Sequence, residues 1–188
     1  MELMQALRSR RSVRVFDGTP VDRAVLEEII AVAALAPSRM NRQPWFFHVA
    51  TGDARRRVAE VMAMTTSYLD EYMDVLGPEG VERAARFYAE LGHAPVVIGV
   101  ATPKTEDRFE TRDFAISVGA SVENLLLAAA DHGLGTCVLS VPHWVADQLT
   151  NVFEIDPEWE IVSLVVLGYA DETPRPQERE AEVAVFLE

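Results

Sequence analysis

Residues 111–133 constrain the fold of this chain more than any other segment, because they form one long run that is apolar around most of a helix. The run reads TRDFAISVGASVENLLLAAADHG and ends at Gly133, a residue suited to the left-handed position that closes a helix. A helix that is apolar around most of its circumference has to be buried in the centre of a domain or between chains. We therefore expect a central or interface helix here.

Four shorter runs are typical of strands. The runs at 95–102 (PVVIGVAT) and 160–169 (EIVSLVVLGY) are almost continuously apolar, as in strands buried on both faces. The runs at 45–51 (WFFHVAT) and 135–141 (GTCVLSV) have the length and composition of strands. Helices precede and separate these runs, but a strict alternation of strand and helix is missing. The pattern therefore favours an α+β fold, with a central mixed β-sheet flanked by helices, over a doubly wound parallel fold.

Helical spacing and helix-ending residues predict the other helices. One follows Asp22, a good N-cap, and stops at Pro37; another covers 53–76 and ends at GPEG; a third covers 142–153. The last apolar run, EVAVFL at 182–187, alternates like a half-buried strand and follows a polar tail that contains prolines. Because sheet edges accept further strands, this terminal strand is a candidate to pair with another subunit.

The composition argues against several classes of protein. With 188 residues the chain suits one domain, 1–188, and its net charge of −13 opposes binding to nucleic acid or to an anionic membrane. It has neither a membrane-spanning apolar stretch nor a signal-peptide pattern, so the expected location is the cytoplasm. Cys137 lies in an apolar strand and is expected to be a buried structural thiol. No metal site is expected, because the four histidines are widely spaced.

The segment 8–16, RSRRSVRVF, is basic although the chain is acidic, and it holds four of the 17 Lys and Arg residues. One interpretation is helix capping, because arginines in the last turn of a helix complement the negative end of its dipole. The other is an anion site, since guanidinium groups and a serine hydroxyl match the oxygens of a phosphate monoester. In an extended segment, Arg10, Ser12 and Arg14 point to one side. Arg11 points to the other.

A second polar motif, PSRMNRQPW at 37–45, connects a predicted helix to a predicted strand. Asn41 and Gln43 offer amide donors and acceptors, and Pro44 keeps the chain extended before Trp45. The motif is either a plain connection or a ligand-binding loop. No Gly-rich dinucleotide or phosphate fingerprint occurs in the sequence.

At these two motifs together, the sequence resembles the nitroreductase family of FMN-dependent oxidoreductases. The resemblance is carried by RRSVRVF (10–16), LAPSRMNRQPWFFHV (35–49), ENLLLAAADHGLGTCVL (123–139) and LVVLGYADETPRP (164–176), which in order and spacing cover nearly the whole chain. Each motif alone is weak, and their joint occurrence is specific. It favours the anion-site interpretation of the basic segment over helix capping.

The last motif departs from the usual form of the family. Ala170 takes the position of the proline in a Gly-Tyr-Pro turn, and Gln177 stands where a basic residue is often found. The resemblance implies that a tail arginine returns to the phosphate of FMN, and the departure leaves open whether this is Arg175 or Arg179. Thr65 is a further candidate for a contact with the flavin ring, in a helix that carries no firm motif.

The resemblance also implies an interlocked homodimer, in which a C-terminal extension adds a strand to the partner's sheet and two FMN sites lie at the subunit interface. Arg10 and Ser12 would bind the FMN phosphate, and Arg14 would face the pyrimidine edge of the flavin. The loop at 37–41 would approach the ring from the other subunit. The implied cofactor-binding residues are Arg10, Arg11, Ser12, Arg14, Pro37, Ser38, Arg39, Met40, Asn41, Gln43, Thr65, Leu139, Ser140, Arg175 and Arg179.

The activity implied by the resemblance is transfer of hydride from NADH or NADPH to FMN, followed by reduction of an electron-poor small molecule such as a nitroaromatic or a quinone. The flavin carries the chemistry, so no catalytic side chain is expected. Three alternatives stay open: an FMN-binding or sensing protein with little turnover, a family member with dehydrogenase, dehalogenase or flavin-consuming chemistry, and a non-enzymatic acidic interaction protein. The segment 68–93 is expected to cover the pocket, where Tyr72, Phe87 and Tyr88 either stack on an acceptor or belong to the core.

Overall fold

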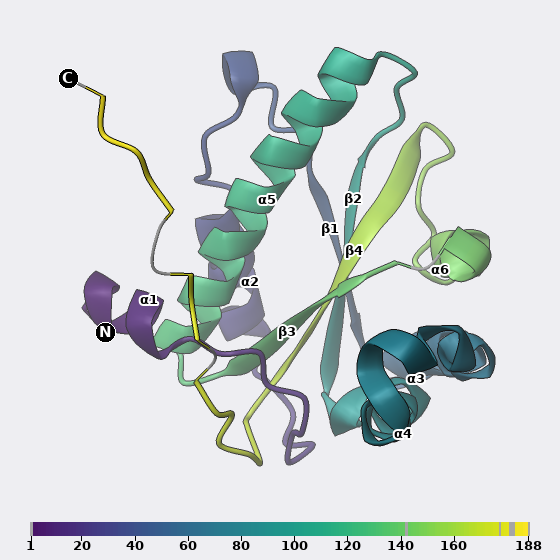
Figure 1. Cartoon of the computed structure of the whole chain (residues 1–188). Coiled ribbons are helices and arrows are strands. Elements are labelled where there is room, and N and C mark those ends of the chain that lie inside the picture. Colours follow the sequence, from purple (N-terminus) through teal and green to yellow (C-terminus); the bar gives the residue numbers. More distant parts are fainter. Residues whose placement is uncertain (1, 142, 177, 181–182, 188) are drawn as a thin grey trace.

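The computed structural model describes residues 2–141, 143–176, 178–180 and 183–187, and it has three layers, with helices on both faces of one sheet (Figure 1). The strands are β1 (Phe46–Thr51), β2 (Val96–Pro103), β3 (Gly135–Ser140) and β4 (Trp159–Gly168). The α-helices are α1 (Leu3–Ser9), α2 (Arg23–Ala33), α3 (Gly52–Ala63), α4 (Met73–Glu90), α5 (Arg108–Asp131) and α6 (Ala146–Val152). Short 3-10 helices are η1 (Arg39–Asn41), η2 (Met64–Tyr72), η3 (Leu91–His93) and η4 (His143–Val145).

The strand order is β1-β2-β4-β3, and every pair of neighbouring strands is antiparallel. The predicted α+β class is confirmed, but the predicted mixed character of the sheet is not found among these four strands. The physical reason is that β4 lies between β2 and β3: both run antiparallel to β4, so they point the same way without touching. Parallel pairing is limited to an isolated bridge between Ser12 and Thr136, beside the edge of β3.

Two apolar cores fill the spaces above and below the sheet. The alternating side chains of the almost fully buried strand β2 point into both of them, as its continuous apolar run predicts. One core joins the sheet to α3, α4 and α6 and includes Val58, Met62, Phe87, Val97, Leu149 and Val166. The other joins it to α2 and α5 and includes Leu26, Ile29, Ile98, Leu125 and Val165.

Helix α5 packs on α2 and the sheet along one side, but its other side is exposed, so the single chain does not bury it all round as the central-helix prediction requires. The alternative prediction, an interface helix, stays a prediction. The end of α5 is followed by Gly133 with φ 74°, as expected for a left-handed cap. Among the described helices, α5 alone has the length and apolar composition that a membrane span needs, and core helices commonly meet the same criterion.

The predicted helix at 53–76 is wrong in its middle. Helix α3 ends at Ala63, and a 3-10 stretch continues to Tyr72. The hydroxyls of Thr65 and Thr66 donate to the carbonyls of Met62 and Ala63, so side chains compete for acceptors at the end of the helix.

The C-terminal segment forms no strand in its described residues 183–187. The side chains of this segment are 82–91% exposed at Val183, Val185, Phe186 and Leu187. The predicted exchange of a terminal strand between subunits therefore stays a prediction.

Candidate functional site

The basic segment after α1 runs beside the outer edge of β3. The backbone N–H of Val13 donates to the carbonyl of Thr136 over 2.9 Å, and the side chains of Val13 and Phe16 enter the core. Ser12 and Arg14, on either side of Val13, are exposed. The alternation expected from the sequence thus holds, because burial of Val13 turns its two neighbours away from the core.

The first two arginines of the segment have different partners. The Nε of Arg10 lies 3.1 Å from Oε1 of Glu123 on α5. The guanidinium of Arg11 donates instead to the carbonyls of Arg8 and Arg10, 2.8 and 2.7 Å away. Arg11 therefore caps the end of α1, as the helix-capping interpretation expects, while the Nε bond leaves the terminal nitrogens of Arg10 for another anion.

Ser12 and Arg14 lie near the thiol of Cys137 on β3. Burial raises the pKa of the Cys137 thiol, and the charge of Arg14 and a hydrogen bond with Ser12 oppose that shift in the pKa. Cys137 is itself buried, as expected of a structural cysteine. Ser12 and Arg14 therefore both lie on the side of the segment that faces Cys137.

The start of the C-terminal tail is fixed to the same segment. The N–H of Asp171 donates to the carbonyl of Val15 over 2.9 Å. The carboxylate of Glu172 accepts from the backbone N–H groups of both Arg14 and Val15. Glu172 therefore occupies both amides and places a negative charge beside the arginines of the segment.

The two tail arginines carry no assigned role in the structure. Arg175 and Arg179 are exposed, and neither takes part in a hydrogen bond or ion pair with the other described residues. Gln177, which departs from the family pattern, lies outside the described residues. The contact between the tail and a phosphate stays a prediction.

The loop that leads to β1 is held in an unusual backbone conformation. Met40, Asn41 and Gln43 have φ values of 53°, 56° and 49°, in the left-handed region that non-glycine residues seldom adopt. The hydroxyl of Ser38 accepts from the N–H of Gln43 over 2.9 Å and fixes this shape. Met40 is 85% exposed, so the loop presents an apolar side chain to its surroundings. Strained, exposed loops of this kind cluster at ligand-binding sites.

Helix α5 anchors this loop through two ion pairs. Arg39 binds Asp113 over 2.5 Å, and Arg42 binds Glu110. The hydrogen bond from Arg42 lowers the pKa of the Glu110 carboxyl, and Thr105 adds a second hydrogen bond that lowers it. The loop therefore lies beside the N-terminal end of α5, together with the exposed side chain of Pro37.

The two predicted halves of the site lie far apart in one chain. Asp113 and Glu123 are ten residues apart on α5, a rise of about 15 Å along the helix axis. Figure 1 shows η1 beside the upper end of α5 and α1 beside its lower end. No hydrogen bond or ion pair joins 10–14 to 37–43 among the described residues. The two halves therefore make no direct polar contact within the described chain.

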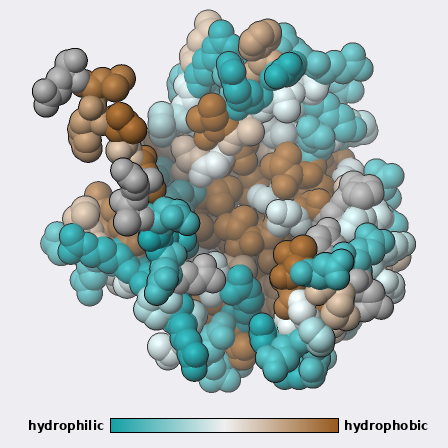
Figure 2. Space-filling view, viewed as in Figure 1, coloured by the Kyte–Doolittle hydropathy of each residue, from teal (hydrophilic) through white to brown (hydrophobic). Residues whose placement is uncertain are grey.

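The remaining predicted residues differ in what they expose. Ser140 is exposed at the end of β3, whereas Leu139 belongs to the core and has only its backbone to offer. Thr65 is buried, and its hydroxyl donates to Met62. Figure 2 shows that this face of the molecule is hollowed between α5 and the helices α3 and α4, and that apolar residues gather in the hollow.

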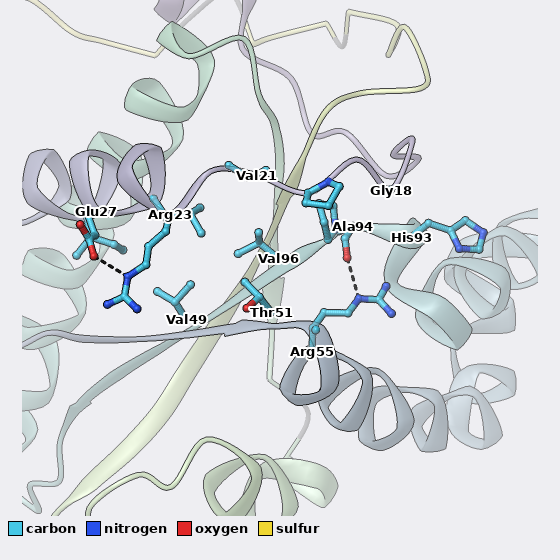
Figure 3. A pocket seen from close by; sticks show the side chains of 15 residues that line it. Gly18, Val21, Arg23, Glu27, Val49, Thr51, Arg55, His93, Ala94 and Val96 are labelled. Atoms are coloured by element: carbon cyan, nitrogen blue, oxygen red, sulfur yellow. Dashed lines mark hydrogen bonds and ion pairs between the residues drawn. The ribbon is translucent and has the colours of Figure 1, made fainter.

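A large cavity of the described chain lies elsewhere. It has a volume of about 1040 Å³ and lies between α2, the end of β1 and the start of β2 (Figure 3). Val21, Val49 and Val96 give it an apolar lining, and Arg55 crosses it to donate to the carbonyl of Ala94. None of the predicted cofactor-binding residues lines it, so it is not the site that the motifs predict.

Two carboxylates of the candidate site were missed by sequence reasoning. Glu123 and Glu172 both lie within quoted motifs, yet nothing in their spacing indicates that they hold the basic segment. Their partners are 113 and 158 residues away, so only the packing of α5 and of the tail beside the segment brings them there.

The family model and the curated relatives both indicate the same family. A family model described as the nitroreductase family matches residues 7–169. The 4-nitrobenzoate reductase of Pseudomonas putida is 28% identical over 195 aligned positions, which cover 87% of this chain and 83% of that protein.

Solved structures share the fold over nearly the full length. A BluB-like flavoprotein from Clostridium difficile 630 superposes with a TM-score of 0.79 at 26% identity and covers 100% of both chains. The FMN-dependent nitroreductase NfnB from Mycobacterium smegmatis, solved in complex with NADPH, has a TM-score of 0.74 at 20% identity and covers 95% of this chain and 97% of that one. At that identity, the likeness to NfnB shows the fold alone.

Proposed function

Since this chain belongs to the nitroreductase family over residues 7–169, we propose that it is a single-domain FMN-dependent oxidoreductase that takes hydride from NADH or NADPH and reduces small electron-poor molecules. The observation that carries this proposal is the set of side-chain donors on the segment beside β3. It combines the partly buried Arg10 with the exposed Ser12 and Arg14.

The donor set fits the phosphate end of FMN. The bond from Nε of Arg10 to Glu123 fixes the plane of the guanidinium, so its terminal nitrogens are available as a fork for two phosphate oxygens. The Ser12 hydroxyl adds a neutral donor beside it. A dianionic group bound here also offsets the local excess of positive charge in the segment.

Arg14 would serve the other end of the flavin. When bound, FMN supplies the redox chemistry, and the protein binds and orients it. A guanidinium at the pyrimidine edge favours negative charge there, which lowers the free energy of the reduced, anionic form. The overall reaction with a nitroaromatic balances as NAD(P)H + H⁺ + ArNO₂ → NAD(P)⁺ + ArNO + H₂O, a transfer of two electrons.

A homodimer would complete the site, and α5 supplies a surface for it. Phe109 and Ile116 are seven residues apart on one face and are 66% and 67% exposed. Ala115 and Gly119, on the same side, are small and exposed, so a second helix can approach closely. A two-fold axis beside α5 would place the 37–43 loop of one chain near the arginines of the other.

The C-terminal tail supplies a second contact between copies. Val183, Val185 and Leu187 alternate along an exposed segment, and within the described chain the outer edge of β1 has no strand beside it. The apolar cavity of Figure 3 lies along that edge at Val49. An added strand from a partner would cover both the edge and the cavity. A cytoplasmic location stays a prediction of the sequence.

Two absorbance measurements test the proposal together. The purified protein, incubated with FMN and freed of excess, should retain bound flavin. Anaerobic addition of NADH or NADPH should then bleach it, and a nitroaromatic should restore the colour. A protein that binds no FMN would favour a non-enzymatic interaction protein, and bound flavin that neither nicotinamide bleaches would favour a flavin-binding or sensing protein.

A further inference from the structure

An aromatic pair joins the two segments that carry predicted contacts to the flavin ring. The rings of Tyr68 on η2 and Trp144 on η4 have centroids 4.9 Å apart with an angle of 37° between their planes. Trp144 packs against the core, whereas Tyr68 is 43% exposed. One face of the Tyr68 ring is therefore supported, and the side chain still offers surface to a ligand.

The position of Tyr68 in its helix places it beside a predicted ring contact. In a 3-10 helix, side chains three residues apart lie on one side, so Tyr68 lies directly after Thr65 on the same side of η2. Trp144 follows Ser140 by four residues, at the exit of β3. The connected helices α3, α4 and α6 border the hollow seen in Figure 2.

By sequence, the residues that could stack on an acceptor are Tyr72, Phe87 and Tyr88. The structure does not show any of them as an exposed ring in its described side chains. Phe87 is buried in the core, and Tyr88 packs against it with ring centroids 5.5 Å apart. The side chain of Tyr72 lies outside the described part of the chain. Among the aromatic residues of 68–93 whose side chains are described, Tyr68 alone is exposed.

The acidic residues around the Tyr68 ring indicate the charge of the acceptor that would bind there. The segment 64–82 contains five acidic residues; Glu79 and Glu82 pair with Arg83 and Arg86, which leaves Asp70, Glu71 and Asp74 nearest to the ring in sequence. Glu71 and Asp74 are exposed, and among the described residues neither takes part in an ion pair. Unpaired carboxylates beside the ring lower the local concentration of anionic ligands relative to neutral ones.

We propose that Tyr68, supported by Trp144, is the stacking surface of the acceptor site, and that it selects flat, uncharged aromatic acceptors over acceptors that carry a carboxylate. The inference rests on the proposed function and specifies its substrate class. It also sets this chain apart from its P. putida relative, whose name states a carboxylate-bearing substrate.

Variants of Tyr68 test the stacking surface. Tyr68→Ala should lower kcat/KM for 4-nitrobenzamide about three- to tenfold, the range expected for loss of one aromatic contact. Tyr68→Phe should restore it, because the ring is kept. Reoxidation by dioxygen, which does not stack, should stay unchanged in both. Val75→Ala, an exposed apolar change in the same segment, is the matched control and should have no effect.

A pair of acceptors that differ in charge tests the selection. The ratio of kcat/KM for 4-nitrobenzamide to that for 4-nitrobenzoate, divided by the same ratio for free reduced FMN, should be about fivefold or more at low ionic strength. It should fall toward unity in 0.5 M salt and in Glu71→Gln/Asp74→Asn. A corrected ratio near one in the wild type would overturn the charge selection.

The outcomes separate this inference from the proposed function. Failure to bind FMN, or flavin that NADH and NADPH leave oxidised, would refute the proposed function. Normal bleaching, with nitroaromatic rates unchanged in Tyr68→Ala, would refute the stacking role of Tyr68 and leave the proposed function intact. An equal loss of the nitroaromatic and dioxygen rates would also refute it, because it would indicate general damage to the site.

Discussion

Gly92 lies against the backbone that carries Arg14, and its replacement by alanine gives a sharp test of the structure. Gly92 has φ 61°, and a Cβ built on it would lie 1.9 Å from the carbonyl oxygen of Arg14. An ordinary C···O contact is about 3.3 Å or longer. The backbone at Arg14 or at Gly92 must therefore move by about 1.4 Å, although the N–H of Phe16 holds the two segments together through the carbonyl of Gly92.

Two costs add in Gly92→Ala. A non-glycine residue in the left-handed region costs about 1–2 kcal/mol. Forcing an extra carbon into a packed site costs about 1–3 kcal/mol more. The free energy of unfolding should fall by about 2–5 kcal/mol in total, which for a domain of this size lowers Tm by about 4–20 °C.

Gly133→Ala is the matched control, because Gly133 has φ 74° and a Cβ there would meet no atom within 4 Å. It should cost only the first of the two terms. Urea unfolding without cofactor measures the loss of unfolding free energy in each variant. The loss in Gly92→Ala minus the loss in Gly133→Ala gives the steric cost at Gly92, which should be about 1–3 kcal/mol. FMN binding, followed by quenching of flavin fluorescence, should weaken in Gly92→Ala and not in Gly133→Ala. Equal losses of stability in the two variants would refute the close approach to Arg14.

Three further predictions use other parts of the chain. Ile116→Glu should convert the protein from dimer to monomer in sedimentation and weaken FMN binding, whereas Val75→Glu, at another exposed position, should leave the dimer intact. Burial of the Cys137 thiol raises its pKa, so iodoacetamide should label it at neutral pH only when the protein unfolds; rapid labelling of the native protein would contradict this. Burial lowers the pKa of His48 below its usual value of 6.5 in spite of an opposing hydrogen bond at Phe153. The unfolded chain therefore binds more protons below about pH 6.5, and the free energy of unfolding should fall as the pH drops through that region, less steeply in His48→Gln.

The secondary structure was predictable wherever a local pattern decides it. The apolar run of β2 forms a buried strand and the long periodic segment forms the helix α5, as expected, although α5 is buried on one side only. The end of α3 was missed because two threonine hydroxyls compete for carbonyls, and their composition alone does not reveal this. The order of the strands was also beyond the sequence, because the place of β4 between β2 and β3 depends on packing between distant segments.

The candidate site was predictable in its residue types and much less in its geometry. Alternation about Val13 correctly indicated that Ser12 and Arg14 share a side, because a buried neighbour fixes the orientation of both. The same alternation separated Arg11 from Arg10, but the sequence did not indicate their partners, which are helix carbonyls for Arg11 and a distant carboxylate for Arg10.

The two halves of the predicted site are anchored far apart on α5, so a complete site would need a second copy of the chain. The arginine segment is tied to α5 at Glu123, and the strained loop is tied to it at Asp113, about 15 Å away along the axis. Both attachments use charged groups on one rigid helix, so neither half can move to the other without breaking an ion pair. A second copy, packed along the exposed face at Phe109 and Ile116, can bring them together without such a movement. Loss of FMN binding in Ile116→Glu would therefore follow from loss of the dimer, since Ile116 belongs to neither half of the predicted site.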